Sequence, residues 1–199
     1  MKRFVDVVFS FILIIILAPA LLVLSIIVRT TSRGPVLFKQ RRAGRDKKEF
    51  YIYKFRTMYL ETPKNMPTHL LENPEKYITP VGRFLRKTSL DELPQLFNII
   101  KGEMSFVGPR PALYNQYDLI SMREELGVNA VRPGVTGWAQ VNGRDELEIP
   151  EKVAFDSYYA KNRSMWFDIK IVFITFYKAI SGHGVVEGKK APENIIKNL

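Results

Sequence analysis

The sequence predicts an α+β fold that is mostly helical, with an N-terminal membrane helix, interfacial amphipathic helices and one small β-hairpin. Three observations indicate this class. Residues 7–28 are uncharged and mostly apolar over a length that can cross a bilayer. Two short aromatic and aliphatic runs flank a glycine-containing turn near residue 44, which is typical of a hairpin. Apolar residues recur at helical spacing in the second half of the chain.

The 199-residue chain is strongly basic, with 30 Lys and Arg against 20 Asp and Glu and a formal net charge of +10. Such a charge indicates an anionic partner: nucleic acid, an anionic membrane face or phosphorylated substrates. The chain has no cysteine, which excludes a disulfide framework, a thiol nucleophile and a zinc–cysteine site. Its two histidines are His69 and His183, so a bound metal is expected to be a hard cation such as Mg²⁺, held by carboxylates and phosphate oxygens.

Residues 1–28 are expected to form the membrane anchor. Basic residues lie on both sides of the apolar run, with Lys2 and Arg3 before it and Arg29 after it. Positive charge marks the cytoplasmic flank of a membrane segment, and Pro19 is expected to kink the helix near its middle. A hairpin that enters and leaves by one face satisfies both flanks. A kinked span is the alternative, because proline is tolerated in spanning helices.

Residues 36–38 and 50–55 are expected to form the strands of the hairpin, with the turn at residues 44–46. The second strand is too aromatic for a free surface, so we expect it to pack on the core or to lie near lipid headgroups. The basic cluster at residues 39–45 is either a solvated turn or, beside a membrane anchor, a contact with anionic lipid.

The central stretch, residues 86–111, contains two adjacent carboxylates, Asp91 and Glu92. A helix is expected to begin between Ser89 and Asp91. Either Ser89 and Glu92 form a capping box, or Asp91 is the N-cap and Pro94 falls in the tolerated first turn. In both cases Asp91 lies where unpaired N–H groups and the positive end of the helix dipole favour anions. Taken alone, such a pair is more often a helix cap than an active site.

Two loops follow the central helix, which is expected to end at Gly102. Prolines on both sides of Arg110 fix its backbone, so this arginine belongs either to a rigid structural loop or to a bidentate phosphate site. The second loop contains three glycines between Arg132 and Arg144, and a ligand is expected to approach its backbone closely. It matches neither a Walker-type phosphate loop nor a dinucleotide-binding fingerprint.

Three further stretches are expected to be helical: residues 112–131, 149–162 and 166–180. The last is too short and too charged to span a membrane. It is either an amphipathic helix lying in the membrane interface or an ordinary core helix. Residues 60–80 are polar and proline-rich, which indicates a surface loop in which His69 is exposed.

Several sequence blocks, taken in order, resemble the small monotopic phosphoglycosyl transferases, a family of bacterial sugar transferases. The resemblance runs from about Lys2 to His183 and rests on the apolar anchor followed by K-F-R-T-M, S-L-D-E-L-P-Q-L-F-N-I-I-K-G-E-M-S-F-V-G-P-R-P, R-P-G-V-T-G-W-A-Q-V-N-G-R and Y-Y-A-K-N-R-S. It implies a re-entrant membrane helix-break-helix over residues 1–28. A catalytic domain over residues 29–199 would then lie at the cytoplasmic face of the bacterial inner membrane. The family breaks its helix at a Ser-Pro pair, whereas this chain has Ala18–Pro19 and lacks that hydroxyl.

The resemblance also implies an activity: transfer of a sugar-1-phosphate from a UDP-sugar to polyprenol (undecaprenyl) phosphate, giving polyprenyl-diphospho-sugar and UMP. This would be the first membrane step of glycoconjugate synthesis. Asp91 matches the family's nucleophile, expected to form a covalent phosphosugar intermediate. Glu92 matches its partner carboxylate, and the two are expected to hold Mg²⁺. The arginines expected near phosphates or in the glycine loop are Arg86, Arg110, Arg132 and Arg144.

Elementary electrostatics agrees with these roles, because a carboxylate that attacks an anionic diphosphate needs cations to lower the repulsion. Anionic headgroups are a further expected partner, no nucleic-acid partner is expected, and homo-oligomerisation is left open. Two other functions stay open from the residues alone. One is a metal-dependent nucleotide-sugar diphosphate hydrolase that uses activated water, and the other is a non-catalytic basic membrane-interaction protein. The sequence does not name the sugar, the polyprenol length or the pathway.

Overall fold

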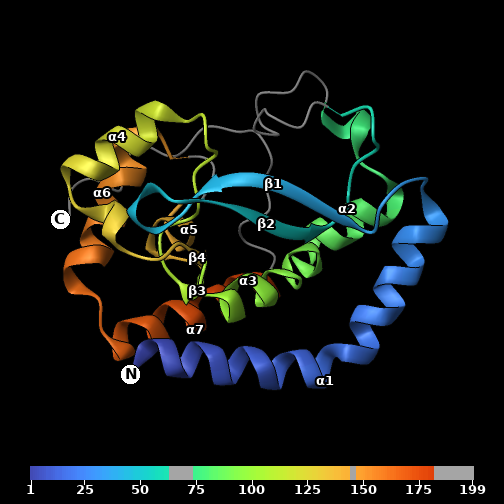
Figure 1. Ribbon diagram of the computed structural model, residues 1–199, viewed down its shortest axis with the longest axis horizontal. Helices are drawn as coiled ribbons and strands as arrows, with labels where there is room; N and C mark the ends of the chain where they lie inside the picture. The colour runs from blue at the N-terminus through green and yellow to red at the C-terminus, as the bar shows by residue number, and fades with distance from the viewer. Residues whose placement is uncertain (63–73, 144–146, 182–199) are drawn as a thin grey trace.

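The computed structural model describes residues 1–62, 74–143 and 147–181 (Figure 1). This part of the chain is mostly helical and carries two small two-stranded sheets, which confirms the predicted α+β class. The helices are α1 (Lys2–Thr31), α2 (Pro80–Lys87), α3 (Gln95–Lys101), α4 (Tyr117–Glu125), α5 (Trp138–Val141), α6 (Ile149–Asn162) and α7 (Met165–Ser181). The strands are β1 (Leu37–Ala43), β2 (Glu49–Phe55), β3 (Ser105–Val107) and β4 (Gly134–Thr136), and the short 3₁₀ turns are η1 (Arg45–Lys47), η3 (Pro74–Tyr77), η4 (Leu90–Glu92) and η5 (Val128–Ala130). His69 and Arg144 lie outside the described residues.

Helix α1 is continuous and includes Pro19. Figure 1 shows it bending, so that its first limb lies below α3 and its second limb rises toward α2. The break predicted at Ala18–Pro19 is therefore a bend within one helix, because proline removes a single hydrogen bond and the helical ladder resumes beyond it. The helix also runs past the predicted anchor boundary at residue 28, to Thr31.

Both ends of α1 are fixed to the same folded body. At the start, the Lys2 ammonium donates to the Val107 carbonyl oxygen at 3.1 Å and forms an ion pair with Asp168. At the end, the buried Arg56 guanidinium donates to the carbonyl oxygen of Ser32 at 2.6 Å. Both ends are thus held on the folded body, and the bend brings them closer together than the roughly 45 Å that a straight helix of 30 residues would span.

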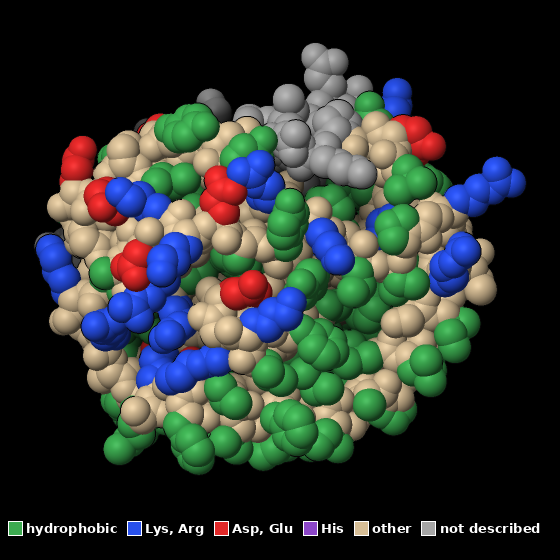
Figure 2. All heavy atoms as spheres, viewed as in Figure 1, with side chains coloured by type: hydrophobic (Ala, Val, Ile, Leu, Met, Phe, Trp, Pro, Cys, Tyr) green, Lys and Arg blue, Asp and Glu red, His purple; other side chains and the backbone are tan. Residues whose placement is uncertain are grey.

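The outer surface of α1 is apolar. Among the described helices, α1 is long and apolar enough to cross a membrane, and only 6% of its most apolar window is buried. Figure 2 shows hydrophobic side chains along the lower edge of the molecule, where α1 runs in the same view of Figure 1. The large exposed side chains on this helix are Phe4, Val8, Phe9, Phe11, Ile12, Ile15, Ile16, Leu22, Val23, Ile26 and Ile27.

Strands β1 and β2 form the predicted antiparallel hairpin, with Leu37 opposite Phe55 and Ala43 opposite Glu49. The first strand is longer than the predicted residues 36–38. Its exposed basic side chains alternate with more buried positions, as in a strand, but from the sequence alone this basic stretch is interpreted as a charged turn. The second strand packs on the core through Phe50, which confirms that alternative.

The predicted start of the central helix is wrong. Ser89 has left-handed backbone angles (φ 55°, ψ 16°) and its side chain caps nothing. The 3₁₀ turn η4 follows, and α3 begins only at Gln95, after Pro94. No capping box forms and Asp91 is not the N-cap of α3, because the chain around Asp91 is held by i to i+3 hydrogen bonds, Glu92 to Ser89 and Leu93 to Leu90. The predicted end at Gly102 (φ 88°) is confirmed.

The glycine loop has a structural role that the sequence did not predict. Strand β4 pairs in parallel with β3, and the paired chains pass very close to each other. A Cβ atom on Gly134 would lie 2.1 Å from the Gly108 nitrogen, and one on Gly137 would lie 2.1 Å from the Gly108 oxygen. The prediction that a ligand approaches these glycines is therefore wrong for Gly134 and Gly137, whose missing side chains make room for the main chain.

The two C-terminal helices were predicted well, since α6 covers residues 149–162 and α7 covers residues 165–181. The predicted helix over residues 112–131 is shorter, with α4 limited to Tyr117–Glu125. Helix α7 has one face in the core and an exposed apolar face opposite it, and its place in a membrane interface stays a prediction. Ile171 is fully buried in a core cluster, whereas Trp166 and Phe173 on the other face are 78% and 71% exposed.

Candidate active site

The η4 turn places Asp91 inside the protein, with 7% of its surface exposed, and Glu92 next to it. The left-handed backbone of Ser89 starts this turn. A left-handed residue other than glycine costs roughly 1–2 kcal/mol, and such residues cluster at functional sites. The turn separates α2 from α3, and cations reach the two carboxylates from β2, from α2 and from the loop after β3.

The first cation is Lys54 of β2. Its ammonium lies 2.5 Å from Glu92 Oε1 and 3.8 Å from Asp91 Oδ2. The buried side chain of Asn98 in α3 fixes this geometry, because it donates to the carbonyl oxygen of Tyr51 at 2.7 Å and accepts from the N–H of Tyr53 at 3.0 Å. The strand carrying Lys54 is thereby bound to the helix that follows the carboxylates.

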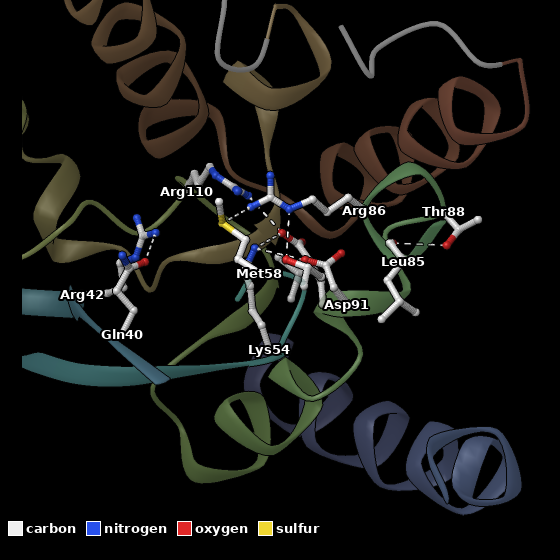
Figure 3. A network of polar contacts seen from close by, with 12 residues as sticks. Gln40, Arg42, Lys54, Met58, Leu85, Arg86, Thr88, Asp91 and Arg110 are labelled. Atoms are coloured by element: carbon white, nitrogen blue, oxygen red, sulfur yellow. Dashed lines mark hydrogen bonds and ion pairs between the residues drawn. The ribbon is translucent and has the colours of Figure 1, made fainter. Parts of the chain in front are cut away.

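The second cation is Arg86 at the end of α2. The Thr79 hydroxyl caps α2 by accepting from Gly82 N–H at 2.9 Å. Gly82 lets the helix lie directly on the main chain of Thr57, since a Cβ atom there would be 2.0 Å from the Thr57 oxygen. Arg86 then donates to Thr57 Oγ1 at 3.0 Å and contacts Met58 Sδ at 3.2 Å. Figure 3 shows that this contact aims the guanidinium toward Asp91.

The third cation is Arg110, which reaches the same carboxylates from the loop after β3 (Figure 3). Its Nη1 atom lies 3.5 Å from Glu92 Oε1. The main chain of Arg110 is itself held, because Arg123 of α4 donates from Nη1 to the Arg110 carbonyl oxygen at 3.0 Å. Arg123 is 4% exposed and is paired with the buried Asp156 of α6, with Nε 3.0 Å from Oδ2.

Burial raises the pKa of the Asp91 carboxyl above its ordinary value, and the charge of Glu92 adds to this effect. Lys54, Arg86 and Arg110 oppose it by favouring the ionised form. The result is a carboxylate with little water around it, which is therefore poorly stabilised by solvation and depends on three cations. Such a group can attack an electrophile that carries negative charge if the same cations also bind that charge.

The described residues contain no group of three or more acidic or histidine side chains that could form a metal cage. The adjacent Asp91 and Glu92 still fit Mg²⁺. This ion is commonly bound by one or two carboxylates together with substrate phosphates, without a site made wholly of protein. The donor set therefore suits an ion that arrives with a diphosphate.

The structure brings together four of the predicted site residues: Asp91, Glu92, Arg86 and Arg110. It does not bring Arg132 to them. The Arg132 Nε atom donates to the Gly102 carbonyl oxygen at 3.0 Å, and its side chain lines a different cavity. Arg132 thus lies apart from these four residues, and its expected role near phosphate stays a prediction.

Two residues of the site were missed from the sequence, Lys54 and Arg123. For Lys54 a signal existed: strand alternation places it on the same face as the buried Phe50 and Ile52, where a lysine needs a partner. For Arg123 there was none, since its partners Asp156 and the Arg110 carbonyl belong to other elements.

Comparison with known proteins agrees with this site. Residues 1–182 match the family described as bacterial sugar transferase. The chain belongs to this family. A bacterial sugar transferase of similar size is EpsL of Bacillus subtilis, uncharacterised, which is 38% identical over 185 residues covering 93% of this chain and 90% of EpsL.

Other similar family members are longer. The UDP-glucose:undecaprenyl-phosphate glucose-1-phosphate transferase of Escherichia coli is 42% identical over 89% of this chain, and the undecaprenyl-phosphate galactose phosphotransferase of Salmonella typhimurium is 40% identical over 88%. The chain spans only 40% and 39% of the length of these two transferases. What they share with it is the sugar transferase region.

Proposed function

We propose that the protein transfers a sugar-1-phosphate from a UDP-sugar to polyprenol (undecaprenyl) phosphate, and that Asp91 carries the phosphosugar between the two substrates. The observation on which this depends is the buried Asp91–Glu92 pair surrounded by Lys54, Arg86 and Arg110. Relatives named for transfer to undecaprenyl phosphate support the choice of acceptor. The activity would begin glycoconjugate synthesis at the membrane.

In the first step, an Asp91 carboxylate oxygen attacks the β-phosphorus of the UDP-sugar. A bond forms between this oxygen and phosphorus, the bond from phosphorus to the bridging oxygen breaks, and UMP leaves with that oxygen. In the second step, a phosphate oxygen of polyprenol phosphate attacks the same phosphorus. The aspartyl bond breaks, polyprenyl-diphospho-sugar forms and the Asp91 carboxylate is restored.

The cations have separate tasks in this scheme. Lys54 holds Glu92 and keeps the ionised form of Asp91 accessible, because its ammonium lies close to both carboxylates. Arg86 and Arg110 have planar guanidinium groups suited to the oxygens of a diphosphate. Mg²⁺ bound by Asp91, Glu92 and the diphosphate would neutralise charge on the leaving UMP.

A lipid acceptor requires the site to lie at a membrane surface, and two faces of the protein support this placement. The outer sides of α1 and α7 expose large apolar side chains of the kind that enter a bilayer interface. Because both ends of α1 are held on one body and both carry basic residues, we propose a re-entrant anchor with the catalytic body at the cytoplasmic face of the inner membrane.

The test is UMP release from a panel of UDP-sugars by the purified full chain with polyprenol phosphate and Mg²⁺ in lipid nanodiscs. We expect one or a few sugars to support turnover, EDTA to abolish it, and Asp91→Asn to reduce it on the order of 10⁴-fold. Omitting the acceptor should leave a phosphosugar adduct on Asp91, detected by mass spectrometry of the peptide. UMP release with no adduct would favour hydrolysis by activated water, and undiminished turnover by Asp91→Asn would reject the mechanism.

A further inference from the structure

A second site lies at the start of α1, away from the carboxylates. A cavity of about 320 Å³ opens between the N-terminus of α1, the hairpin turn η1, the segment after η5 and the junction of α6 with α7. None of Lys54, Arg86, Asp91, Glu92 or Arg110 lines it. The cavity therefore has no part in the chemistry proposed for Asp91.

The cavity is positively charged. Five basic side chains and two carboxylates line it, a formal excess of three positive charges; the basic ones are Lys2, Arg3, Arg45, Arg132 and Arg163. Asp168 is already paired with Lys2. Within the described residues, no carboxylate lies at salt-bridge distance from Arg3 or Arg132, whose guanidinium groups donate to carbonyl oxygens at the end of α3. Carbonyl groups carry no net charge, so these two guanidinium groups have no ion-pair partner. Arg45 is paired with Asp46 outside the lining, which leaves a formal excess of two positive charges.

The wall of the cavity also contains an unpaired hydroxyl. Ser105 of β3 is 1% exposed, and its Oγ atom has no hydrogen-bond partner among the described residues. Its main-chain N–H is used in the sheet, by donation to the Pro133 oxygen at 2.9 Å. A buried hydroxyl without a partner is unfavourable. Because Ser105 lines the cavity, a rotation of its side chain would let the hydroxyl donate to a ligand oxygen there.

The surroundings of the cavity indicate how such a ligand is attached. Phe4 follows Arg3 in α1 and is 73% exposed, and Trp166 follows Met165 in α7 and is 78% exposed. The basic cavity thus adjoins the apolar surfaces of both helices. A molecule with an anionic oxygen-rich head and apolar chains fits both features, with the head among the arginines and the chains against the aromatic side chains.

We propose that this cavity binds a phosphate group, and that its ligand is the headgroup of an anionic membrane phospholipid. Guanidinium groups and a hydroxyl are the donors that phosphate oxygens accept from. A bound lipid would hold the first turn of α1 and the first turn of α7 at the same depth in the membrane. The proposal does not rest on the transfer activity, because it involves none of the residues assigned to that reaction.

The experiment uses the full chain extracted in mild detergent from membranes containing phosphatidylglycerol and phosphatidylethanolamine, with retained lipids identified by native mass spectrometry. The test variant is Arg45→Gln with Arg163→Gln, two exposed cations of the cavity wall. The matched control is Lys48→Gln with Lys161→Gln, which removes the same charge from exposed positions near by in sequence but outside the lining. Ser105→Ala tests the hydroxyl with little change in volume.

We expect the original chain and the lysine control to retain phosphatidylglycerol in preference to phosphatidylethanolamine. The arginine variant should lose this retention on the order of tenfold, with a smaller loss for Ser105→Ala. Equal loss in the lysine control, or no selectivity in the original chain, would overturn the lipid site.

A second measurement separates a headgroup from a free anion. The delipidated chain is melted in inorganic phosphate and in chloride at equal ionic strength. A phosphate-specific rise in Tm that Arg45→Gln with Arg163→Gln removes supports the phosphate site. If that rise occurs without any lipid retention, the ligand is free phosphate and the assignment to a lipid is wrong. If neither measurement shows a dependence on these arginines, the site is rejected.

Discussion

The guanidinium of Arg123 donates a hydrogen bond across 3.0 Å to the main-chain carbonyl oxygen of Arg110. The same guanidinium is paired with Asp156, and both of these side chains are buried. The loop that presents Arg110 to Glu92 is therefore held by a pair of residues that do not themselves contact the carboxylates. Arg123 is a positioning residue for the candidate active site.

A lysine at position 123 tests this role. Arg123→Lys keeps a charge for Asp156 but loses the planar fork that also reaches the Arg110 carbonyl. We expect turnover to fall about tenfold, which corresponds to one hydrogen bond, with most of the change in kcat. Asp156→Asn should instead lower the stability by about 3–5 kcal/mol, because it leaves a buried guanidinium unpaired. Equal kcat in Arg123→Lys and the original chain would contradict the positioning role.

Lys54 is expected to be essential to the reaction, although no role was assigned to it from the sequence. Lys54→Met removes the ammonium that lies 2.5 Å from Glu92 and 3.8 Å from Asp91, so the pKa of Asp91 should rise further and less of the nucleophile should be ionised. We expect turnover to fall by about 10²–10³-fold. Lys39→Met on the neighbouring strand is the control and should stay within a factor of about two. Steady-state UMP release measures both.

Asp91→Asn should make the protein more stable while it removes activity. The pKa of Asp91 is raised in the folded state, so the folded protein binds this proton more tightly than the unfolded chain does. Stability attributable to Asp91 therefore falls as the pH rises from the ordinary aspartate pKa through the folded-state value. Asparagine carries no charge, so its Tm should exceed that of the original chain at neutral pH, and the difference should shrink in acid. A lower Tm for Asp91→Asn at pH 7 would contradict the raised pKa.

Gly82→Ala is expected to disturb the site through α2. The added Cβ atom would lie 2.0 Å from the Thr57 oxygen, so the helix must shift and carry Arg86 with it. We expect a loss of stability of about 1–3 kcal/mol, together with a loss of turnover. Gly127→Asn is a suitable control, because nothing lies within 4 Å of its added Cβ atom and asparagine tolerates the positive φ of 71°. Denaturant unfolding compares the two variants.

The topology of α1 can be tested with single cysteines, because the chain contains none of its own. One cysteine is joined ahead of Met1 and another replaces the exposed Arg33. A membrane-impermeant maleimide should label both in inverted inner-membrane vesicles and neither in intact spheroplasts, since both ends of α1 are fixed to one body. Labelling of the two cysteines from opposite sides would reject the re-entrant anchor.

Local patterns predicted much of the fold. The apolar run gave the position of α1, the turn near Gly44 gave the hairpin, and helical spacing gave α6 and α7 almost to the residue. The errors arose where a distant contact overrides local preference. Ser89 and Glu92 have the residue types of a capping box, yet the chain there forms a 3₁₀ turn that packs against α2 and β2. Gly134 has the residue type of a ligand loop, yet it is packed against Gly108.

The sequence by itself determined the adjacency of Asp91 and Glu92, the basic charge, the apolar first helix and the order of motifs that resembles the sugar transferases. These are properties of composition and of neighbours along the chain. Only the tertiary structure decided that Lys54, Arg86 and Arg110 converge on the carboxylates while Arg132 faces a separate cavity. Those positions depend on contacts between elements far apart in sequence, such as β2 with α3 and β3 with β4, and local periodicity carries no information about such contacts.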